Sequence, residues 1–506
     1  MSHTRKIFRN SVSSLGNKLV TIALSFISRK LFLMFLTEEL LGLNSLFSDL
    51  LGLLNLADMG LAIAVQFNLF KPIAEKDYDK IGRILNATSR IYNLIGTGII
   101  LAGIGLSFFI QYFIKENPYE LSFLRVVFII NVVSNAATYF FVHKRIFMQA
   151  CEDLHISYTV DTVVNLVCSV LRIVTIAVFK NYYAFVLVTA LQAVISNIVL
   201  AIACDKRHPY LQKIKGFTKE EMQPLLGSIK ELLPNKISAY IFSCTDNTIL
   251  SLFIGLSSIT MYTNYNSIVL QFFTMAAMFS GIIKVSLGNV IQERKNKEDH
   301  ILFLKAYQLF QFFYSSFCTV ALFCLLDDFV ALWYGEKFLV GLAVVVILTL
   351  DFYLHSMYQP LSAMLEVLGE FKALKWQEIA AMILNIVVSV GLVVPFGIAG
   401  PVLGTLAVDL LTTIFRLHTI LYKNYREWFK DYLRTYIMYA LVFLAQYVAL
   451  YAAFALVPLE RSLWLFLAKG VTCFVVVIGS NLLLFHRKPE FVYLKDRALQ
   501  LLKRKG

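Results

Sequence analysis

The chain has 506 residues, of which 58% are hydrophobic and only 16% are charged. A mean hydropathy of +0.69 excludes an ordinary soluble globular protein and indicates an all-α polytopic membrane protein. The net charge of +13 is spread over many segments and forms no single patch, so the sequence argues against nucleic-acid binding.

Apolar segments long enough to cross a hydrocarbon core of roughly 30 Å recur along the whole chain. We predict about fourteen transmembrane helices, separated by short polar connections. They cover approximately residues 15–36, 41–67, 92–114, 121–142, 157–179, 183–203, 237–256, 263–285, 302–326, 339–358, 376–395, 401–420, 436–457 and 464–485.

Lysine and arginine in the connections predict the orientation, because cytoplasmic loops carry an excess of them. With both termini in the cytoplasm, the cytoplasmic segments hold 32 of the 46 basic residues, and the outer loops hold four. The first span has no small-residue cleavage site after a short apolar core, so we expect a retained anchor.

A long polar stretch divides the predicted spans into two groups. Residues 204–236 are expected to be a cytoplasmic linker between an N-terminal six-helix lobe, residues 1–203, and a C-terminal six-helix lobe, residues 237–420. Two extra transmembrane helices within residues 421–485 and a basic cytoplasmic tail, residues 486–506, follow.

Short internal matches indicate that the two lobes are a duplicated, pseudo-symmetric pair. NLVCSV at 165–170 and NIVVSV at 385–390 share four residues in register, 220 positions apart. LGNK at 15–18 and LPNK at 233–236 are 218 positions apart. A parallel repeat of this kind predicts a transporter whose substrate site lies between the lobes.

Sequence motifs of catalysis are absent. The chain contains no GxxxxGK[ST], HExxH or GxSxG motif, and its outer loops are too short for an extracellular catalytic domain. The seven cysteines show no CxxC and no ligand-like spacing, so neither a metal nor a disulfide is expected. We therefore expect a protein that is not an enzyme and that has no cofactor.

Charged residues inside the apolar spans are the informative feature. Arg29 and Lys30 stand in the middle of SFISRKLFLMFL, residues 25–36, and Arg172 is equally deep in the fifth span. Charge at that depth costs a few kcal/mol unless it meets a partner, water or a ligand. Helical spacing predicts one polar stripe along the first span, facing a cavity or a neighbouring helix. Its members are Asn17, Lys18, Thr21, Ser25, Ser28 and Arg29.

The seventh span repeats this arrangement, so a wet cleft between the lobes would explain both polar faces. Its polar residues are Lys236, Tyr240, Ser243, Asp246 and Asn247. Acidic residues in other spans offer a competing explanation, because Arg29 could pair with Asp58 as a structural ion pair. The functional alternative is an anionic ligand, since guanidinium offers a two-pronged donor to phosphate oxygens.

Three stretches resemble one family of membrane proteins. They are GLNSLFSDLLGLLNLADMGLAIAVQFNLFKPIAEKDYDKIGRI at 42–84, FISRKLFLMFL at 26–36 and DDFVALWYGEKF at 327–338. They are similar to the second span and its loop, the end of the first span, and the outer loop after the ninth span of Wzx-like polysaccharide flippases. These flippases belong to the multidrug, oligosaccharidyl-lipid and polysaccharide (MOP) exporter superfamily, which also contains MATE and MurJ.

The resemblance implies a transporter of the bacterial plasma (inner) membrane. It would move undecaprenyl-diphosphate-linked oligosaccharide repeat units from the inner to the outer leaflet for surface polysaccharide assembly, by alternating access of two lobes. Its implied partners are this lipid-linked glycan, membrane lipids, and the polysaccharide polymerase and export machinery.

The deep basic residues then become candidate contacts for the substrate diphosphate. These candidates are Arg29, Lys30, Arg172, Lys18 and Lys236. Asp58 and Asp246 are candidates for H⁺ or Na⁺ coupling or for ion pairs, and no motif decides between these roles.

Other functions stay open at this point. A lipid II flippase of the same superfamily would need a similar cationic site. A cation-coupled multidrug antiporter is expected to present carboxylates to cationic compounds, so the deep basic residues count against it. A membrane polysaccharide polymerase is disfavoured by the short outer loops.

Overall fold

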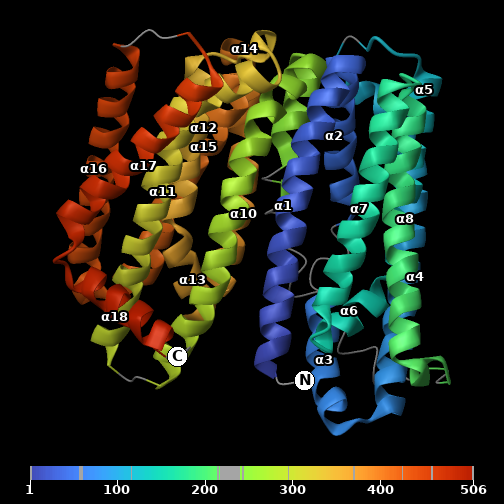
Figure 1. The fold of residues 1–506 in the computed structure, drawn as a ribbon, viewed down its shortest axis with the longest axis horizontal. Coiled ribbons are helices and arrows are strands. Elements are labelled where there is room, and N and C mark those ends of the chain that lie inside the picture. Colours follow the sequence, from blue (N-terminus) through green and yellow to red (C-terminus); the bar gives the residue numbers. More distant parts are fainter. Residues whose placement is uncertain are drawn as a thin grey trace. The chain divides into compact units, whose positions relative to one another are not determined.

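The computed structural model describes residues 3–55, 61–115, 117–213, 216, 240–241, 244–293, 296–368, 371–423, 425–456 and 460–503. Within these residues every regular element is a helix, as predicted, and Figure 1 follows the helices along the chain. The chain divides into two compact units, Met1–Thr260 (unit 1) and Met261–Gly506 (unit 2). The predicted lobe and linker boundaries stay predictions, and most of the linker lies outside the described residues.

Unit 1 contains the first eight labelled helices and two short 3₁₀ turns. Its elements are α1 (His3–Phe35), α2 (Glu38–Leu54), α3 (Leu61–Glu75), α4 (Tyr78–Ser107), η2 (Ile110–Phe113), α5 (Leu121–Tyr139), α6 (Val142–Ala150), α7 (Leu154–Ala177), α8 (Tyr182–Arg207) and η3 (Pro209–Lys213). A further helical stretch at 244–253 leads into the first residues of α10 (Leu256–Glu293).

Unit 2 contains the rest of α10 and the remaining helices. These are α11 (Lys297–Trp333), η4 (Glu336–Phe338), α12 (Leu342–Met357), α13 (Gln359–Leu368), α14 (Phe371–Phe396), α15 (Ala399–Leu417), the π-turn η5 (His418–Tyr422), η6 (Arg426–Trp428), α16 (Phe429–Ala455), α17 (Leu463–Phe485) and α18 (Pro489–Lys503). The last helix falls within the predicted basic tail.

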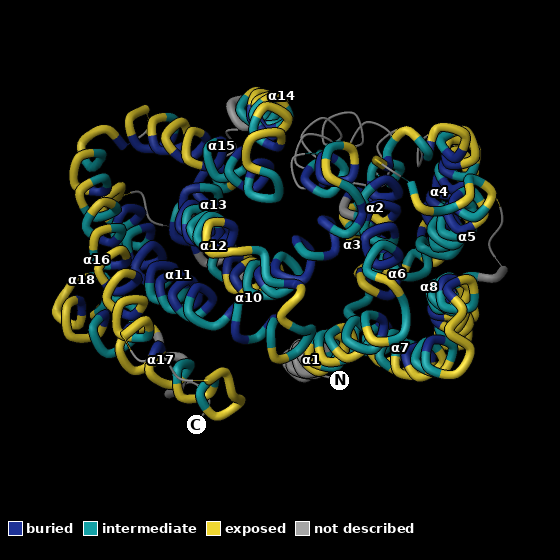
Figure 2. Tube along the Cα trace, turned by 90° about the horizontal axis from the view of Figure 1, so that it is seen from above, coloured by how far each residue is buried: buried dark blue, intermediate teal, exposed yellow. Residues whose placement is uncertain are grey.

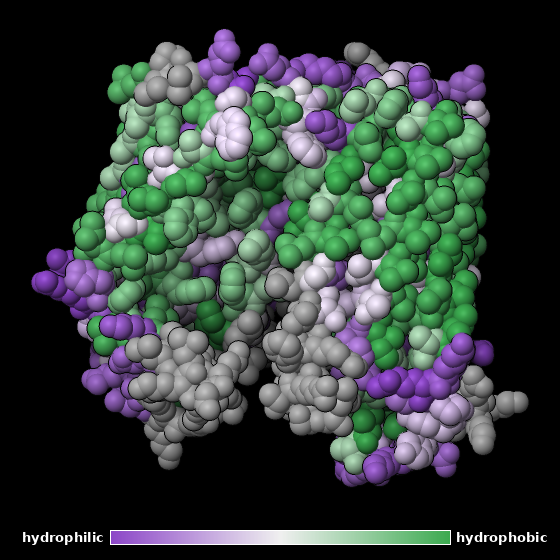
Figure 3. Space-filling model, viewed as in Figure 1, coloured by the Kyte–Doolittle hydropathy of each residue, from purple (hydrophilic) through white to green (hydrophobic). Residues whose placement is uncertain are grey.

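The chain is a multi-pass membrane protein. Ten segments of the described residues are long and apolar enough to cross a membrane, and the predicted total of fourteen stays a prediction. Large apolar side chains stand exposed on these helices, among them Leu94, Val394 and Leu483, as expected where lipid is the solvent. Figure 3 shows the hydrophobic flanks of the helices, with hydrophilic side chains gathered near helix ends.

The helices differ from the predicted spans in length and continuity. α4 begins at Tyr78, well before the predicted start at 92, because an amphipathic stretch of about four turns, capped by Asp77, precedes the apolar part. The second predicted span is divided between α2 and α3. The short helices α6 and α13 were not predicted, since each is too short to give an apolar span signal.

Stacked aromatic rings attach the extra helix α16 to its neighbours in unit 2. Tyr439 stacks on Phe312 of α11 with ring centroids 4.5 Å apart. Tyr447 stacks on Phe323, also of α11, at 3.9 Å, and Phe443 stacks on Tyr353 of α12 at 3.9 Å. Helix α16 is therefore an integral part of unit 2, and Figure 2 shows its buried residues on the side facing α11.

Helices α14 and α15 approach each other closely at two glycines. A Cβ atom on Gly404 would lie 2.4 Å from the Ser389 Oγ and 3.0 Å from the Ser389 backbone nitrogen. A Cβ atom on Gly400 would lie 2.4 Å from the Leu392 carbonyl oxygen. The GxxxG spacing thus permits backbone contact between these helices, as small residues do in other membrane proteins.

Gly404→Ala should lower the apparent melting temperature of the detergent-solubilised protein, because overpacking of this kind costs about 1–3 kcal/mol. Gly391→Ala is the matched control, since Gly391 lies on α14 with nothing within 4 Å of its added Cβ. The control should match or slightly exceed the wild type, because alanine favours helix more than glycine does. Equal melting temperatures for both variants would contradict the close-packing account.

Candidate functional site

The polar stripe of α1 faces α7. The Asn17 Nδ2 donates to the Thr162 Oγ1 at 2.7 Å and to the Tyr158 carbonyl oxygen at 3.2 Å. One turn later, the Asn165 Nδ2 donates to the Thr21 Oγ1 at 3.3 Å. Beyond the stripe, Phe32 packs against two aromatic rings of α8. The first half of the stripe therefore meets a neighbouring helix, one of the two environments that the sequence predicts.

Asn165 is the centre of a polar cluster that joins three helices of unit 1. Its Oδ1 accepts hydrogen bonds from the Ser169 Oγ at 3.3 Å, the Gln192 Nε2 at 3.3 Å and an Arg172 Nη2 at 3.4 Å. We call Thr21, Asn165, Ser169, Arg172 and Gln192 the Asn165 cluster. Its members come from α1, α7 and α8.

Arg172 is the only charged member of this cluster. Its Nη2 donates to the Ser169 Oγ at 2.7 Å, a neutral neighbour one turn earlier on α7. Among the described residues no carboxylate lies within ion-pair distance of Arg172. The Arg172 Nε and the Gln192 Oε1 are buried without a hydrogen-bond partner in the described structure. Buried polar atoms of this kind mark a place where a ligand or water is expected.

The other predicted cations of α1 lie on different sides of the helix. Successive residues of an α-helix are 100° apart around its axis, so Lys18 and Arg29 lie within about 20° of each other on one face. That face is roughly 60–80° around the axis from Thr21. Lys30 is nine residues after Thr21, so it lies on about the opposite side. Arg29 and Lys30 are both partly buried, and both have interaction partners. Lys236 and Asp58, and with them the predicted Arg29–Asp58 pair, lie outside the described residues.

The polar residues after the linker contact α2 within unit 1. The Asn247 Nδ2 donates to the Asp49 Oδ2 at 2.6 Å, and the Tyr240 hydroxyl donates to the Asp49 carbonyl oxygen at 3.1 Å. Asp246 is buried, 8% exposed, and it also has interaction partners. Its predicted role in ion coupling stays a prediction.

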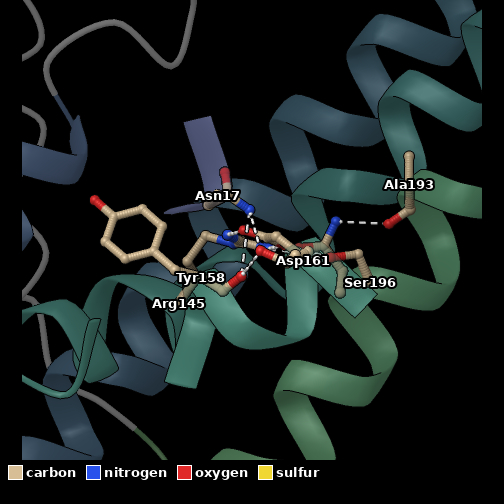
Figure 4. A network of polar contacts seen from close by, with 8 residues as sticks. Asn17, Arg145, Tyr158, Asp161, Ala193 and Ser196 are labelled. Atoms are coloured by element: carbon tan, nitrogen blue, oxygen red, sulfur yellow. Dashed lines mark hydrogen bonds and ion pairs between the residues drawn. The ribbon is translucent and has the colours of Figure 1, made fainter. Parts of the chain in front are cut away.

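A second network in unit 1 was missed at the sequence level (Figure 4). The Arg145 guanidinium on α6 binds the Asp161 carboxylate on α7 through two hydrogen bonds of 2.8 and 2.9 Å. The Ser196 Oγ on α8 donates to the same carboxylate at 2.5 Å. Here the basic group is fully matched by an acid, in contrast to Arg172.

The neighbouring residues of α6 carry one further balanced pair. The Lys144 Nζ lies 2.5 Å from the Asp205 Oδ2 of α8. Burial, together with the neighbouring Lys144 charge, lowers the pKa of the adjacent His143 to about 4, so this imidazole is neutral at pH 7. The only uncompensated charge in these described polar networks of α6, α7 and α8 is therefore that of Arg172.

The duplicated motif occurs in both units but makes different contacts. In α14 the Asn385 Nδ2 donates to the Thr405 Oγ1 of α15 at 2.9 Å, and Ser389 adjoins Gly404. The position 220 residues after Arg172 is Leu392, whose carbonyl group contacts Gly400. The copy in α14 serves close helix packing, and only the copy in α7 is followed, two residues later, by an arginine.

These features define a polytopic α-helical membrane protein with a cationic polar cluster among membrane-spanning helices. Solved structures place its fold more narrowly. The chain is similar to the lipid II flippase MurJ in an inward closed conformation, with a TM-score of 0.70 and 14% identity over 94% of this chain and 98% of that one.

Two further solved structures share the fold. An inward-facing multidrug resistance MATE family transporter of the MOP superfamily has a TM-score of 0.65 and 14% identity, over 83% of this chain and 99% of that one. A MOP superfamily transporter from Pyrococcus furiosus has a TM-score of 0.57 and 16% identity, over 84% of this chain and 96% of that one. No protein-family model and no curated protein sequence matches the chain. The fold is therefore MurJ- and MATE-like, as predicted, while the polysaccharide flippase subtype stays a prediction.

A double-mutant cycle on Arg145 and Asp161 should reveal strong coupling. Asp161→Leu and Arg145→Met should each destabilise the protein by about 1–3 kcal/mol, because each strands a partly buried charge. The double variant should recover part of this loss when thermal unfolding in detergent is compared. Additive losses would contradict the pairing. Arg145→Lys should be less stable than the wild type, since lysine keeps the charge but lacks the two-pronged geometry.

Proposed function

We propose that this protein is a flippase of the bacterial plasma membrane. Its substrate is an undecaprenyl-diphosphate-linked oligosaccharide repeat unit, which it moves from the inner to the outer leaflet for surface polysaccharide assembly. The observation that carries this proposal is Arg172, a partly buried guanidinium in a membrane-spanning helix, with no carboxylate nearby among the described residues.

An anionic head group fits the Asn165 cluster chemically. A guanidinium binds two phosphate oxygens at once, and the hydrogen bonds are charge-assisted. The carboxamides of Asn165 and Gln192 and the hydroxyls of Thr21 and Ser169 can donate to further phosphate or sugar oxygens. The present hydrogen bonds of Asn165 Oδ1 are 3.3–3.4 Å long, so a ligand that replaces them displaces only weak contacts.

The other cations of α1 are assigned supporting roles. Lys18 and Arg29 share a face next to the one that carries Thr21, so a head group bound at Arg172 can extend towards them. Lys30 lies on the side of α1 that faces away from the Asn165 cluster. It can contact the diphosphate only when the head group is not bound at Arg172. Lys236 lies outside the described residues, so its role as a diphosphate contact stays a prediction from the sequence.

Two related functions differ in their fit to this site. A multidrug antiporter for cationic compounds would meet a guanidinium and no acidic member in the Asn165 cluster, so cation binding is disfavoured there. A lipid II flippase remains the second candidate, because the similar MurJ structure is described as one and the head-group charge is alike. The membrane potential favours outward movement of either anionic head by about 2.3 kcal/mol per charge per 100 mV.

Deletion of the gene separates these candidates. Mass spectrometry of lipid extracts, together with surface staining, should show accumulated undecaprenyl-linked repeat units and loss of surface polysaccharide. Loss of viability with accumulated lipid II would instead support the second candidate. An unchanged lipid pool with an intact surface would contradict both.

Arg172→Ala should reduce surface polysaccharide at least tenfold at equal protein level, because the diphosphate loses its charge-assisted contacts. Arg172→Lys should retain part of the activity, since lysine keeps the charge but not the fork. Arg90→Ala is the matched control, an exposed arginine of α4, and should export normally. Full export by Arg172→Ala would show that the guanidinium does not contact the substrate.

A further inference from the structure

Helices α11 and α17 of unit 2 lie side by side and run in opposite directions (Figure 1). Two polar contacts fix how their residues face each other. Near the end of α11, the Lys469 Nζ lies 2.6 Å from the Asp328 Oδ2. Twelve residues earlier on α11 and twelve later on α17, the Asn481 Nδ2 donates to the Ser316 Oγ at 3.0 Å. The two helices therefore stay in step over these residues.

The facing residues recur at every fourth position of both helices. Residues four apart form a ridge on the surface of an α-helix, so one ridge of α11 faces one ridge of α17. A further step of four brings Phe312 to Phe485, whose rings meet edge-on at 5.6 Å. Between the two polar contacts, the same step pairs Val320 with Val477, both fully buried. We call this row of facing pairs the α11–α17 seam.

One pair of the seam consists of two cysteines. Cys324 and Cys473 occupy the step between the valines and the Asp328–Lys469 ion pair, and their thiols hydrogen-bond with each other. Both thiols are free in this structure. Spacing along the chain gave no sign of a disulfide, because 149 residues separate the two cysteines and only helix packing brings them together.

The two thiols lie at similar depth but differ in exposure. Cys324 comes nine residues before the end of α11, and Cys473 comes ten residues after the start of α17, so both are about 14 Å from those helix ends. The orientation predicted from the sequence places these ends at the outer face, the side on which disulfides persist. Cys473 is fully buried, whereas Cys324 is partly exposed, so Cys324 is the thiol that an oxidant reaches first.

We propose that Cys324 and Cys473 are a site of reversible oxidation, at which a disulfide bond joins α11 to α17. The oxidant is a small neutral peroxide, with hydrogen peroxide as its simplest member. This inference goes beyond the proposed function and does not depend on it, because the seam lies within unit 2 and shares no residue with the Asn165 cluster.

The oxidation proceeds in two steps. The Cys324 sulfur, as its thiolate, attacks one peroxide oxygen, the O–O bond breaks, and a sulfenic acid and one water are formed once the thiol proton is passed on. The Cys473 sulfur then attacks the sulfenic sulfur, the S–O bond breaks, and a second water leaves. In total, two thiols lose two electrons and two protons, and one hydrogen peroxide becomes two waters.

The disulfide would connect helices that are distant in sequence. It closes a covalent loop that contains α12 to α16, and so restricts the unfolded chain more than the folded one. The folded seam already brings the two sulfur atoms together, so little movement of α11 or α17 is needed. The expected effect is therefore a gain in stability.

The first test maps the disulfide by mass spectrometry. Purified full-length protein in detergent is treated with hydrogen peroxide, denatured, alkylated with N-ethylmaleimide and digested. Peptides that link Cys324 to Cys473 should appear after peroxide and disappear after dithiothreitol. Cys324→Ala should give no linked peptide. Cys318→Ala is the matched control, since Cys318 is a buried cysteine of the same helix outside the seam, and it should keep the link.

The second test compares apparent melting temperatures in detergent. Peroxide should raise the value for the wild type by at least about 3 °C, and dithiothreitol should reverse the rise. Cys473→Ala should show no rise, and Cys473→Ser serves as the second variant should alanine impair folding. Cys318→Ala should respond as the wild type does.

Three results would overturn the proposal. They are alkylation of both cysteines after peroxide, oxidation of Cys324 to a sulfinic acid without a link, and a linked protein whose melting temperature does not rise. None of them bears on the flippase proposal, which the lipid extracts and the Arg172 variants test separately.

Discussion

The hydrocarbon core of a membrane supplies no counterion, so each charge within the spans must be matched by the protein or by a ligand. Three basic residues in or beside the described spans follow that rule. Arg145 is matched by Asp161, Arg416 by Glu378 and Lys469 by Asp328. Arg172 differs, because its described partners are neutral side chains of its own helix. This difference supports a role in ligand binding for Arg172 and a structural role for the matched pairs.

The same constraint distinguishes the two copies of the repeated motif. Asn385 and Ser389 serve the packing of α14 against α15, where two glycines admit backbone contact and Leu392 takes the position corresponding to Arg172. Asn165 and Ser169 instead hold a guanidinium and link α1, α7 and α8. On this account, unit 1 carries permanent positive charge for an anionic substrate.

Apolar length and helical spacing predicted the helical fold, the approximate spans and the polar face of α1, because each depends on neighbours within one helix. The same logic identified Arg172 by its depth. The partners of these residues could not be predicted, since Arg145 meets Asp161 and Ser196, and His355 meets Asp409, only after helices distant in sequence pack together. Lys30 shows that depth in a span does not predict which side of the helix a residue occupies. Its depth equals that of Arg29, but only a continuous helix, α1 from His3 to Phe35, fixes it about half a turn from Thr21.

Binding of the purified full-length protein to undecaprenyl diphosphate and to undecaprenol, compared by native mass spectrometry, tests the central claim most directly. The two lipids share a tail and differ in the anionic head. The account predicts at least tenfold tighter binding of the diphosphate, and loss of most of that preference in Arg172→Ala. Equal binding of both lipids, or an unchanged preference in the variant, would contradict the claim that Arg172 receives an anionic head group.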